Sequence, residues 1–134
     1  MVGFVFLTLA AVINVANAEV SRIDLEIESI QLIPYTPNAQ QPVQVVARIR
    51  NSGTEEANNV YVSYTLWKQG EKIKTVEDIP VLSHLPRMGS GLSEPVSIGM
   101  LVAGSYKIEM SVYLASKKEN NENNNTRAIT FRVA

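Results

Sequence analysis

The residues Val43 to Thr54 read VQVVARIRNSGT, and this stretch decides the fold class of the chain. Positions 43, 45, 47 and 49 are apolar, whereas positions 44, 48 and 50 between them are polar. A period of two predicts a β-strand with one buried face. The polar run after the strand, with Gly53 inside it, predicts a turn.

The same alternation recurs along most of the chain. The residues predicted to face inward are Val60, Val62, Tyr64 and Leu66, then Val96, Ile98 and Met100, then Tyr106, Ile108, Met110, Val112 and Leu114, and finally Ile129, Phe131 and Val133. In the first strand, the apolar pair 25 and 27 has one parity and the pair 30 and 32 has the other. A bulge near Glu28–Ser29 would turn both pairs inward, as in a strand that crosses between two sheets.

About seven short strands with turns between them, and no helical periodicity, predict an all-β, immunoglobulin-like sandwich of two antiparallel sheets. The segment from Pro80 to Pro95 contains further proline and glycine, and it predicts a long crossover loop. A chain of 134 residues suits a single domain. We therefore expect a sandwich domain over residues 19–134.

Residues 1–18 contain no charged side chain, and we expect a hydrophobic helix there, ahead of the sandwich. One interpretation is a signal peptide, because Ala16-Asn17-Ala18 has the small-x-small pattern of a cleavage site. The others are a membrane anchor and a helix that packs against copies of itself through Gly3, Ala10, Ala11 and Asn14. Each interpretation places the domain outside the cell.

These residues resemble the CARDB family, a bacterial and archaeal cell-surface module named for its proposed link to adhesion. The resemblance runs from Asp24 to Val133 and is carried by five features in order: the first strand 24–30, the proline-containing turn 37–42, the strand and Asn-x-Gly turn 45–54, the strand entry 103–106 and the Asn-rich hairpin 119–126. Where the family often has an Asp after the penultimate strand, this chain has residues 115–118, ASKK. The resemblance implies an immunoglobulin-like sandwich on the cell surface and no activity.

The composition argues against several functions. A net charge of −1 is unlike that of nucleic-acid-binding proteins. A chain with one histidine, His84, and no cysteine is poorly supplied for a zinc centre. We expect His84 in a loop, the hairpin 119–125 as a polar turn, and Tyr106 in a tyrosine corner. We expect no catalytic residue, no cofactor and no metal, and hence no enzyme.

Three aromatic residues have outward parity: Tyr61, Trp67 and Tyr113. Such side chains can anchor a protein partner or stack on sugars, or the predicted loop 80–95 can cover them. Asn124 begins the glycosylation sequon Asn124-Asn125-Thr126.

Three functions remain open. The chain is a surface module that contacts another protein, or it is the subunit of a filament in which residues 1–18 form the core helix, or it binds carbohydrate. The second plan is similar to that of archaeal type IV pilins. Membrane contact is expected only through residues 1–18, if they are retained.

Overall fold

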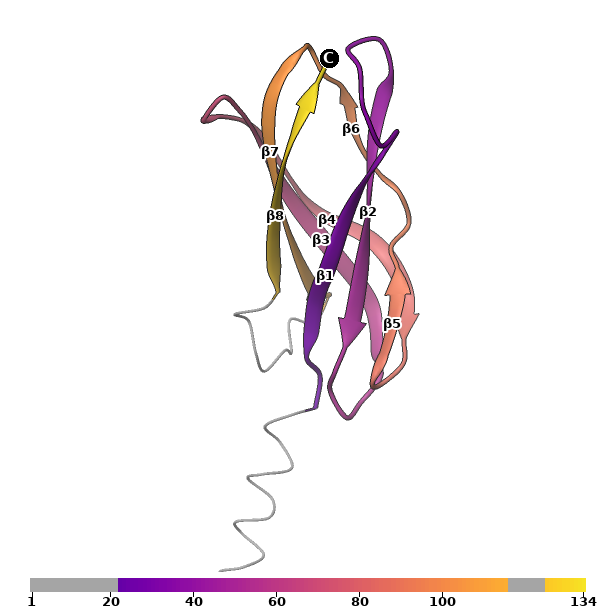
Figure 1. Cartoon of the computed structure of the whole chain (residues 1–134). Coiled ribbons are helices and arrows are strands. Elements are labelled where there is room, and N and C mark those ends of the chain that lie inside the picture. Colours follow the sequence, from indigo (N-terminus) through magenta and orange to yellow (C-terminus); the bar gives the residue numbers. More distant parts are fainter. Residues whose placement is uncertain (1–21, 116–124) are drawn as a thin grey trace, which may run out of the picture.

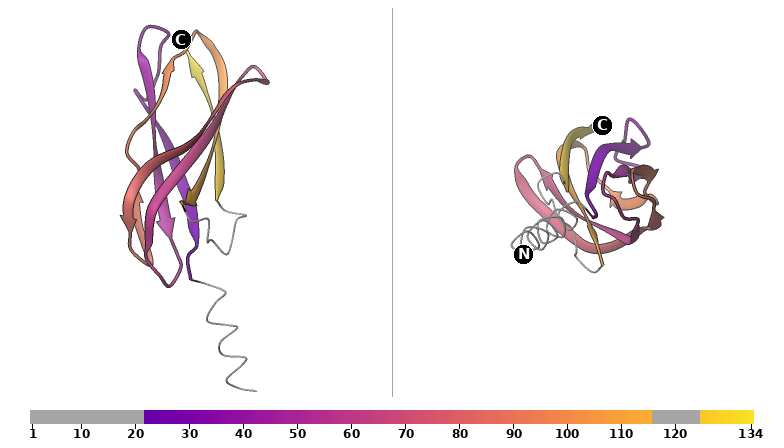
Figure 2. Two further views of the ribbon diagram at one scale, coloured as in Figure 1. Left: turned by 180° about the vertical axis from the view of Figure 1, so that it is seen from behind. Right: turned by 90° about the horizontal axis from the view of Figure 1, so that it is seen from below.

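The computed structural model describes residues 22–115 and 125–134, and these residues form two antiparallel sheets (Figure 1). The strands are β1 (Leu25–Ile33), β2 (Pro42–Asn51), β3 (Ala57–Lys68), β4 (Glu71–Leu85), β5 (Gly89–Leu92), β6 (Val96–Met100), β7 (Gly104–Leu114) and β8 (Thr126–Val133). One sheet has the order β1-β2-β5, with β6 also paired to β2, and the other has the order β4-β3-β7-β8. Seen from below, the sheets form two layers (Figure 2).

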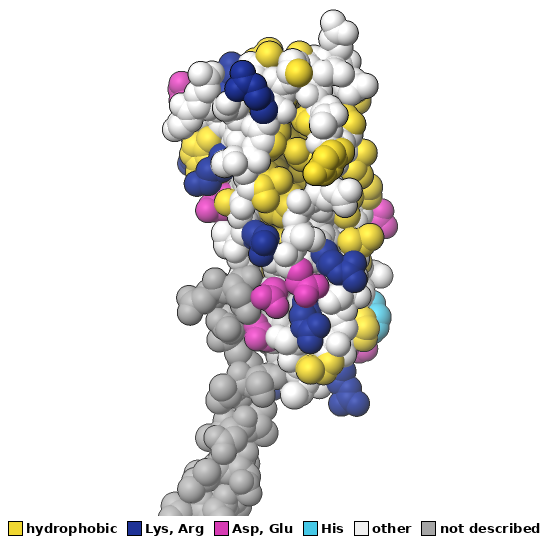
Figure 3. Space-filling model, in the orientation of Figure 1, with side chains coloured by type: hydrophobic (Ala, Val, Ile, Leu, Met, Phe, Trp, Pro, Cys, Tyr) yellow, Lys and Arg dark blue, Asp and Glu magenta, His cyan; other side chains and the backbone are white. Residues whose placement is uncertain are grey.

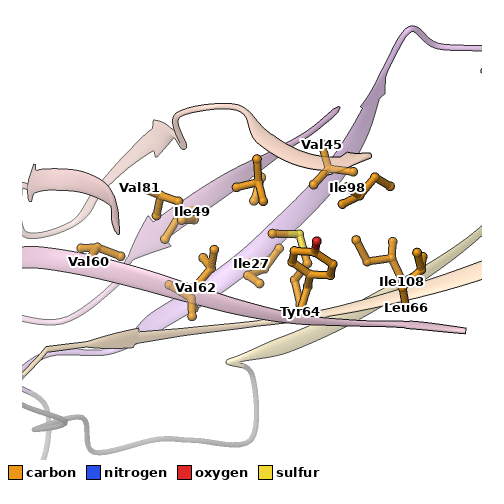
Figure 4. Packing of buried hydrophobic residues seen from close by; sticks show 14 of the residues in the cluster. Ile27, Val45, Ile49, Val60, Val62, Tyr64, Leu66, Val81, Ile98 and Ile108 are labelled. Atoms are coloured by element: carbon orange, nitrogen blue, oxygen red, sulfur yellow. The ribbon is translucent and has the colours of Figure 1, made fainter. Parts of the chain in front are cut away.

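The core lies between the two sheets, where the predicted inward parity of the strands is confirmed. The buried side chains of β2, β3 and β7 are Val43, Val45, Ala47, Ile49, Val60, Val62, Tyr64, Leu66, Tyr106, Ile108, Met110, Val112 and Leu114. Figure 4 shows Val45 and Ile98 of one sheet facing Leu66 and Ile108 of the other. At β8, an edge strand, only Val133 is fully buried, and the inward residues 129 and 131 are half-buried.

The predicted bulge in β1 is confirmed, since the register between β1 and β2 shifts between Ile27 and Ser29. Beyond the bulge, Ile30 and Leu32 pack against the core. The expected crossing between sheets is wrong, because β1 stays paired with β2 from Leu25 to Ile33. The bulge by itself turns Ile30 and Leu32 toward the core.

The alternation in β6 ends one residue earlier than the sequence predicts. Val96 and Ile98 are buried, but Met100 is 63% exposed. The register between β6 and β2 shifts within this strand, and Gly99 has a φ of 90°. A bulge inverts the faces of the residues beyond it, which is why Met100 points outward.

The long crossover loop predicted from Pro80 to Pro95 is wrong, because strands occupy most of this segment. β4 pairs with β3 as far as Leu85, and β5 follows and pairs with β2. Pro80 is tolerated since β4 is an edge strand, where a missing N–H need not break the ladder. Proline and glycine here mark irregular edges, and the structure has eight strands instead of about seven.

The turn after β2 is held by the buried side chain of Asn51. Its Nδ2 donates to the carbonyl oxygen of Glu55 at 2.8 Å, and its Oδ1 accepts from the N–H of Gly53 at 3.0 Å. A Cβ at Gly53 would lie 2.6 Å from the carbonyl oxygen of Arg22. Only glycine allows the backbone at position 53 to come this close to residues 22–24. The Asn-x-Gly turn therefore packs the end of β2 against the segment that leads into β1.

Candidate contact surface

The outer face of β3 and β7, which points away from the core, carries the three aromatic residues that the sequence singles out. Tyr61, Trp67 and Tyr113 are all half-buried. The register pairs Tyr61 with Tyr113 and Trp67 with Lys107. The structure therefore brings the two tyrosines together at one end of this face and leaves the tryptophan at the other end.

The tyrosine end is ordered by a contact from β4. The rings of Tyr61 and Tyr113 are 6.4 Å apart between centroids. The hydroxyl of Tyr113 donates to Oδ1 of Asp78 at 2.6 Å, and it accepts from the backbone N–H of Asp78 at 2.8 Å. Burial, followed by the hydrogen bond and negative charge of Asp78, raises the pKa of Tyr113 to about 12. The hydroxyl is thus neutral and fixed at ordinary pH.

The tryptophan end carries positive charge. Nζ of Lys107 lies 4.8 Å from the centroid of the Trp67 ring, within the range of a cation–π contact. Lys107 is exposed, and Trp67 is half-buried. An amphipathic site of this kind suits a partner that offers an apolar surface next to a carboxylate.

Two pairs of hydroxyl side chains lie between the two aromatic ends. The hydroxyl oxygens of Thr65 and Thr75 lie 3.0 Å apart, and those of Ser111 and Thr126 lie 2.9 Å apart. No motif in the sequence marks these residues. The outward parity of Ser63, Thr65 and Ser111 was the available signal, but only the register shows which strands bring hydroxyls together.

A hollow of about 390 Å³ lies beside the tyrosine end. It is lined on one side by Tyr61 and on the other by residues of β4 and the segment before β6, including Pro80, His84 and Glu94. The strand β4 continues the sheet next to β3. The predicted loop 80–95, which was to cover the aromatic residues, is therefore absent. The hollow can accept a partner's side chain.

His84 lies on β4, and the predicted loop position is wrong. Its Nδ1 is 3.3 Å from Oδ1 of Asn58 and 3.4 Å from Oε2 of Glu56, and the latter contact is an ion pair when the ring is protonated. Within residues 22–115 and 125–134, no three His, Asp or Glu side chains converge as metal ligands. The expectation that the domain needs no metal stays a prediction.

The predicted tyrosine corner is present at Tyr106, on the inner face of β7. Its hydroxyl donates to the carbonyl oxygen of Val102 at 2.7 Å, and its ring stacks on Phe131 with centroids 5.5 Å apart. Burial raises the pKa of Tyr106. This tyrosine has a structural role.

Several predicted sites lie outside the described residues. They are Asn124 with most of the Asn-rich hairpin, and the proposed assembly residues Gly3, Ala10, Ala11 and Asn14. The described part of the chain contains no helix long and apolar enough to cross a membrane. The fate of residues 1–18 stays a prediction.

Comparison with known proteins places these features in a family. The sequence model of the CARDB family matches residues 22–129. No curated protein matches the chain. A domain of a proposed cell surface protein from Methanosarcina acetivorans has the same fold, with a TM-score of 0.57 at 22% identity over 84% of this chain and 93% of that one.

The CARDB domain of a Pyrococcus furiosus protein is similar as well. Its crystal structure, in complex with di-metal ions, gives a TM-score of 0.53 at 16% identity over 84% of this chain and 90% of that one. Its solution structure gives 0.52 at 17% identity over 85% and 97%. At these identities the likeness is one of fold.

Proposed function

We propose, from the premise that this chain belongs to the CARDB family, that it is a non-catalytic cell-surface module that acts by contact with another protein. The family match covers most of the chain, and a domain with this fold comes from a proposed cell surface protein. The fold likeness supports an exported sandwich module, and contact is the part that we infer from the surface.

The observation that carries this proposal is the outer face of β3 and β7. A sheet face exposed to water normally holds polar residues that alternate with the core. Here the face holds Tyr61, Tyr113 and Trp67 in half-buried positions, with Asp78 and Lys107 fixing their ends. Large aromatic side chains held in one geometry lose little conformational freedom on binding, which favours their use as anchors.

The experiment is binding of the labelled protein to cells of the source organism, with wild type compared with a Tyr61→Ala, Trp67→Ala double variant. We expect the double variant to lose most of the binding. The matched control is Arg50→Ala, on the outer side of β2, which should bind as wild type does. Wild-type binding that the double variant retains would contradict the proposed surface, and the absence of any wild-type binding would contradict the function.

Pretreatment of the cells separates a protein partner from the carbohydrate alternative. Protease treatment should abolish binding, and periodate oxidation of glycans should leave it unchanged. The reverse pattern would make the chain a carbohydrate-binding module that stacks sugars on Trp67.

A second candidate function is that of a filament subunit, and the uncharged segment 1–18 directly before the sandwich favours it. If this apolar segment is retained, it must be buried away from water, because burial gains about 25 cal/mol of free energy per Å² of apolar surface. The small residues Gly3, Ala10 and Ala11 would allow close helix packing in a filament core. Intact mass and electron microscopy of surface material test this, since a mature protein that begins at Glu19 without filaments would reject it.

A further inference from the structure

Among the residues that the structure describes, β8 is a long and regular sheet edge. It runs for eight residues from Thr126 to Val133, pairs with β7 without a register shift, and contains no proline. The other edges are interrupted: β1 has a bulge, β4 has Pro80 and three register shifts, and β5 has only four residues. Natural proteins usually blunt regular edges, because an open edge templates pairing with another strand.

The outward backbone groups of β8 can be assigned from its last residue. The N–H of Ala134 donates to the carbonyl oxygen of Pro37, and its carbonyl oxygen accepts from the N–H of Ala39. These contacts lie on the side away from β7, and the hydrogen-bonding side alternates along a strand. The residues at positions 126, 128, 130 and 132 therefore direct their N–H and C=O groups away from β7.

An apolar groove of about 700 Å³ accompanies this edge. It lies between β1 and β8 and is lined by Ile30, Leu32 and Tyr35 on one side and by Ile129 and Phe131 on the other. Figure 3 shows hydrophobic side chains gathered over this part of the molecule, and Tyr35 is 80% exposed. A strand added to β8 would place every second side chain over this groove.

We propose that the strand added to β8 is β8 of a second copy, paired antiparallel about a two-fold axis at Ile129. This seam is separate from the aromatic outer face of β3 and β7, so the self-pairing is a contact in addition to the function proposed above. In an antiparallel pair, residues whose N–H and C=O groups point to the partner strand lie opposite each other. The hydrogen-bonded pairs across this seam can therefore form only between even positions. Since the loop 37–39 occupies Ala134, the pairing that uses all the remaining edge joins 126 with 132 and 128 with 130.

This register is also free of like-charge conflict. It places Arg127 opposite Phe131 of the second copy, and Arg132 opposite Thr126 of the second copy. Like charges directly opposite each other on a sheet are destabilising, and an arginine over an aromatic ring is favourable. Ile129 meets its own copy over the groove, and about eight backbone hydrogen bonds close the seam. The strand is thus self-complementary in both backbone and side chains.

Cysteine cross-linking of the full-length protein in mild detergent tests the register. The chain contains no cysteine, so a single introduced thiol reports one position. Ile129→Cys should give a covalent dimer on mild oxidation, because a residue opposite itself in a non-hydrogen-bonded pair lies about 4.5 Å away between Cα atoms, within disulfide reach. Ala128→Cys alone should give no covalent dimer, because position 128 is not opposite itself, whereas a mixture of Ala128→Cys and Thr130→Cys proteins should cross-link.

A proline variant tests the backbone seam. Thr130→Pro removes an outward N–H that β7 does not use, and edge strands tolerate such a change. We expect the dimer to be lost by light scattering, while the matched Thr130→Val variant, which keeps the N–H, stays dimeric. A dimer that survives Thr130→Pro in a folded protein would overturn the proposal.

The cysteine pattern decides the question even where the proline variant does not fold. Equal cross-linking at positions 128 and 129, or none at 129, would overturn the proposal. Absence of the Ile129→Cys dimer together with intact cell binding would reject only the homodimer. Intact dimers without cell binding would reject the contact function proposed for the outer face.

Discussion

The two faces of β3 and β7 are built from the same strands but are held by different interactions. On the inner face, Leu66, Ile108 and Met110 are completely buried between the sheets. On the outer face, the half-buried residues meet as separate pairs, such as Tyr113 with Asp78 and Lys107 with Trp67. Close packing of apolar side chains stabilises the inner face, whereas pairwise contacts organise the outer face.

The largest expected effect is on the inner face, at Met110. The substitution Met110→Ala should lower the free energy of unfolding by about 2–5 kcal/mol, because it leaves a cavity in a closed core. Urea unfolding measures this loss. The neighbouring change Ser111→Ala, on the outer face, should cost no more than about 1 kcal/mol. Equal losses at the two positions would remove the distinction between the faces.

A smaller effect is expected at the tyrosine corner. Tyr106→Phe removes the hydroxyl that donates to Val102 but keeps the ring stacked on Phe131. We expect a loss of about 0.5–1.5 kcal/mol in the free energy of unfolding. Tyr64→Phe is the matched control, since its hydroxyl contact to the carbonyl oxygen of Ser97 is longer, at 3.4 Å. The order of the two losses would be reversed if the corner had no structural role.

The outer face should show a pH dependence through Tyr113, and the buried Tyr106 of the inner face, whose pKa is also raised, acts in the same direction. The folded pKa of Tyr113, about 12, lies above the ordinary value of 10.0. The folded protein then holds a proton that the unfolded chain releases, so its stability is complete below about pH 10 and falls as the pH rises toward 12. Denaturant unfolding at several pH values between 9 and 11.5 measures this fall. Tyr113→Phe should make this fall less steep, and an unchanged slope would contradict the raised pKa of Tyr113.

The smallest effect is expected at the tryptophan end. Lys107→Met removes the charge over Trp67 and should cost about 0.5–1 kcal/mol, the size of an exposed cation–π contact. Trp67 is the only tryptophan, so its fluorescence reports the change directly. Lys107→Arg keeps the charge and should behave as wild type. Identical emission spectra for all three proteins would show that the contact is absent in solution.

The core and the CARDB family could be predicted from the sequence, but the edges could not. Alternation in β2, β3 and β7 is a local signal, and the bulge in β1 was visible as a change of parity. At β4 and β5 the proline and glycine residues indicate a loop, yet pairing with β3 and β2 overrides them. The alternation predicts the wrong face for Met100, because the register shift between Ser97 and Gly99 depends on the partner strand β2.

In β2, β3 and β7 the sequence by itself determined which residues face the core and which face the solvent, because that choice follows from the period of two within one strand. It therefore also identified Tyr61, Trp67 and Tyr113 as outward residues. Only the tertiary structure decided which outward residues meet. Tyr113 reaches Asp78 across 35 positions of sequence, and that meeting depends on the pairing of β3 with both β4 and β7. Register between distant strands is set by bulges and by the packing of both sheets together, and no single segment contains that information.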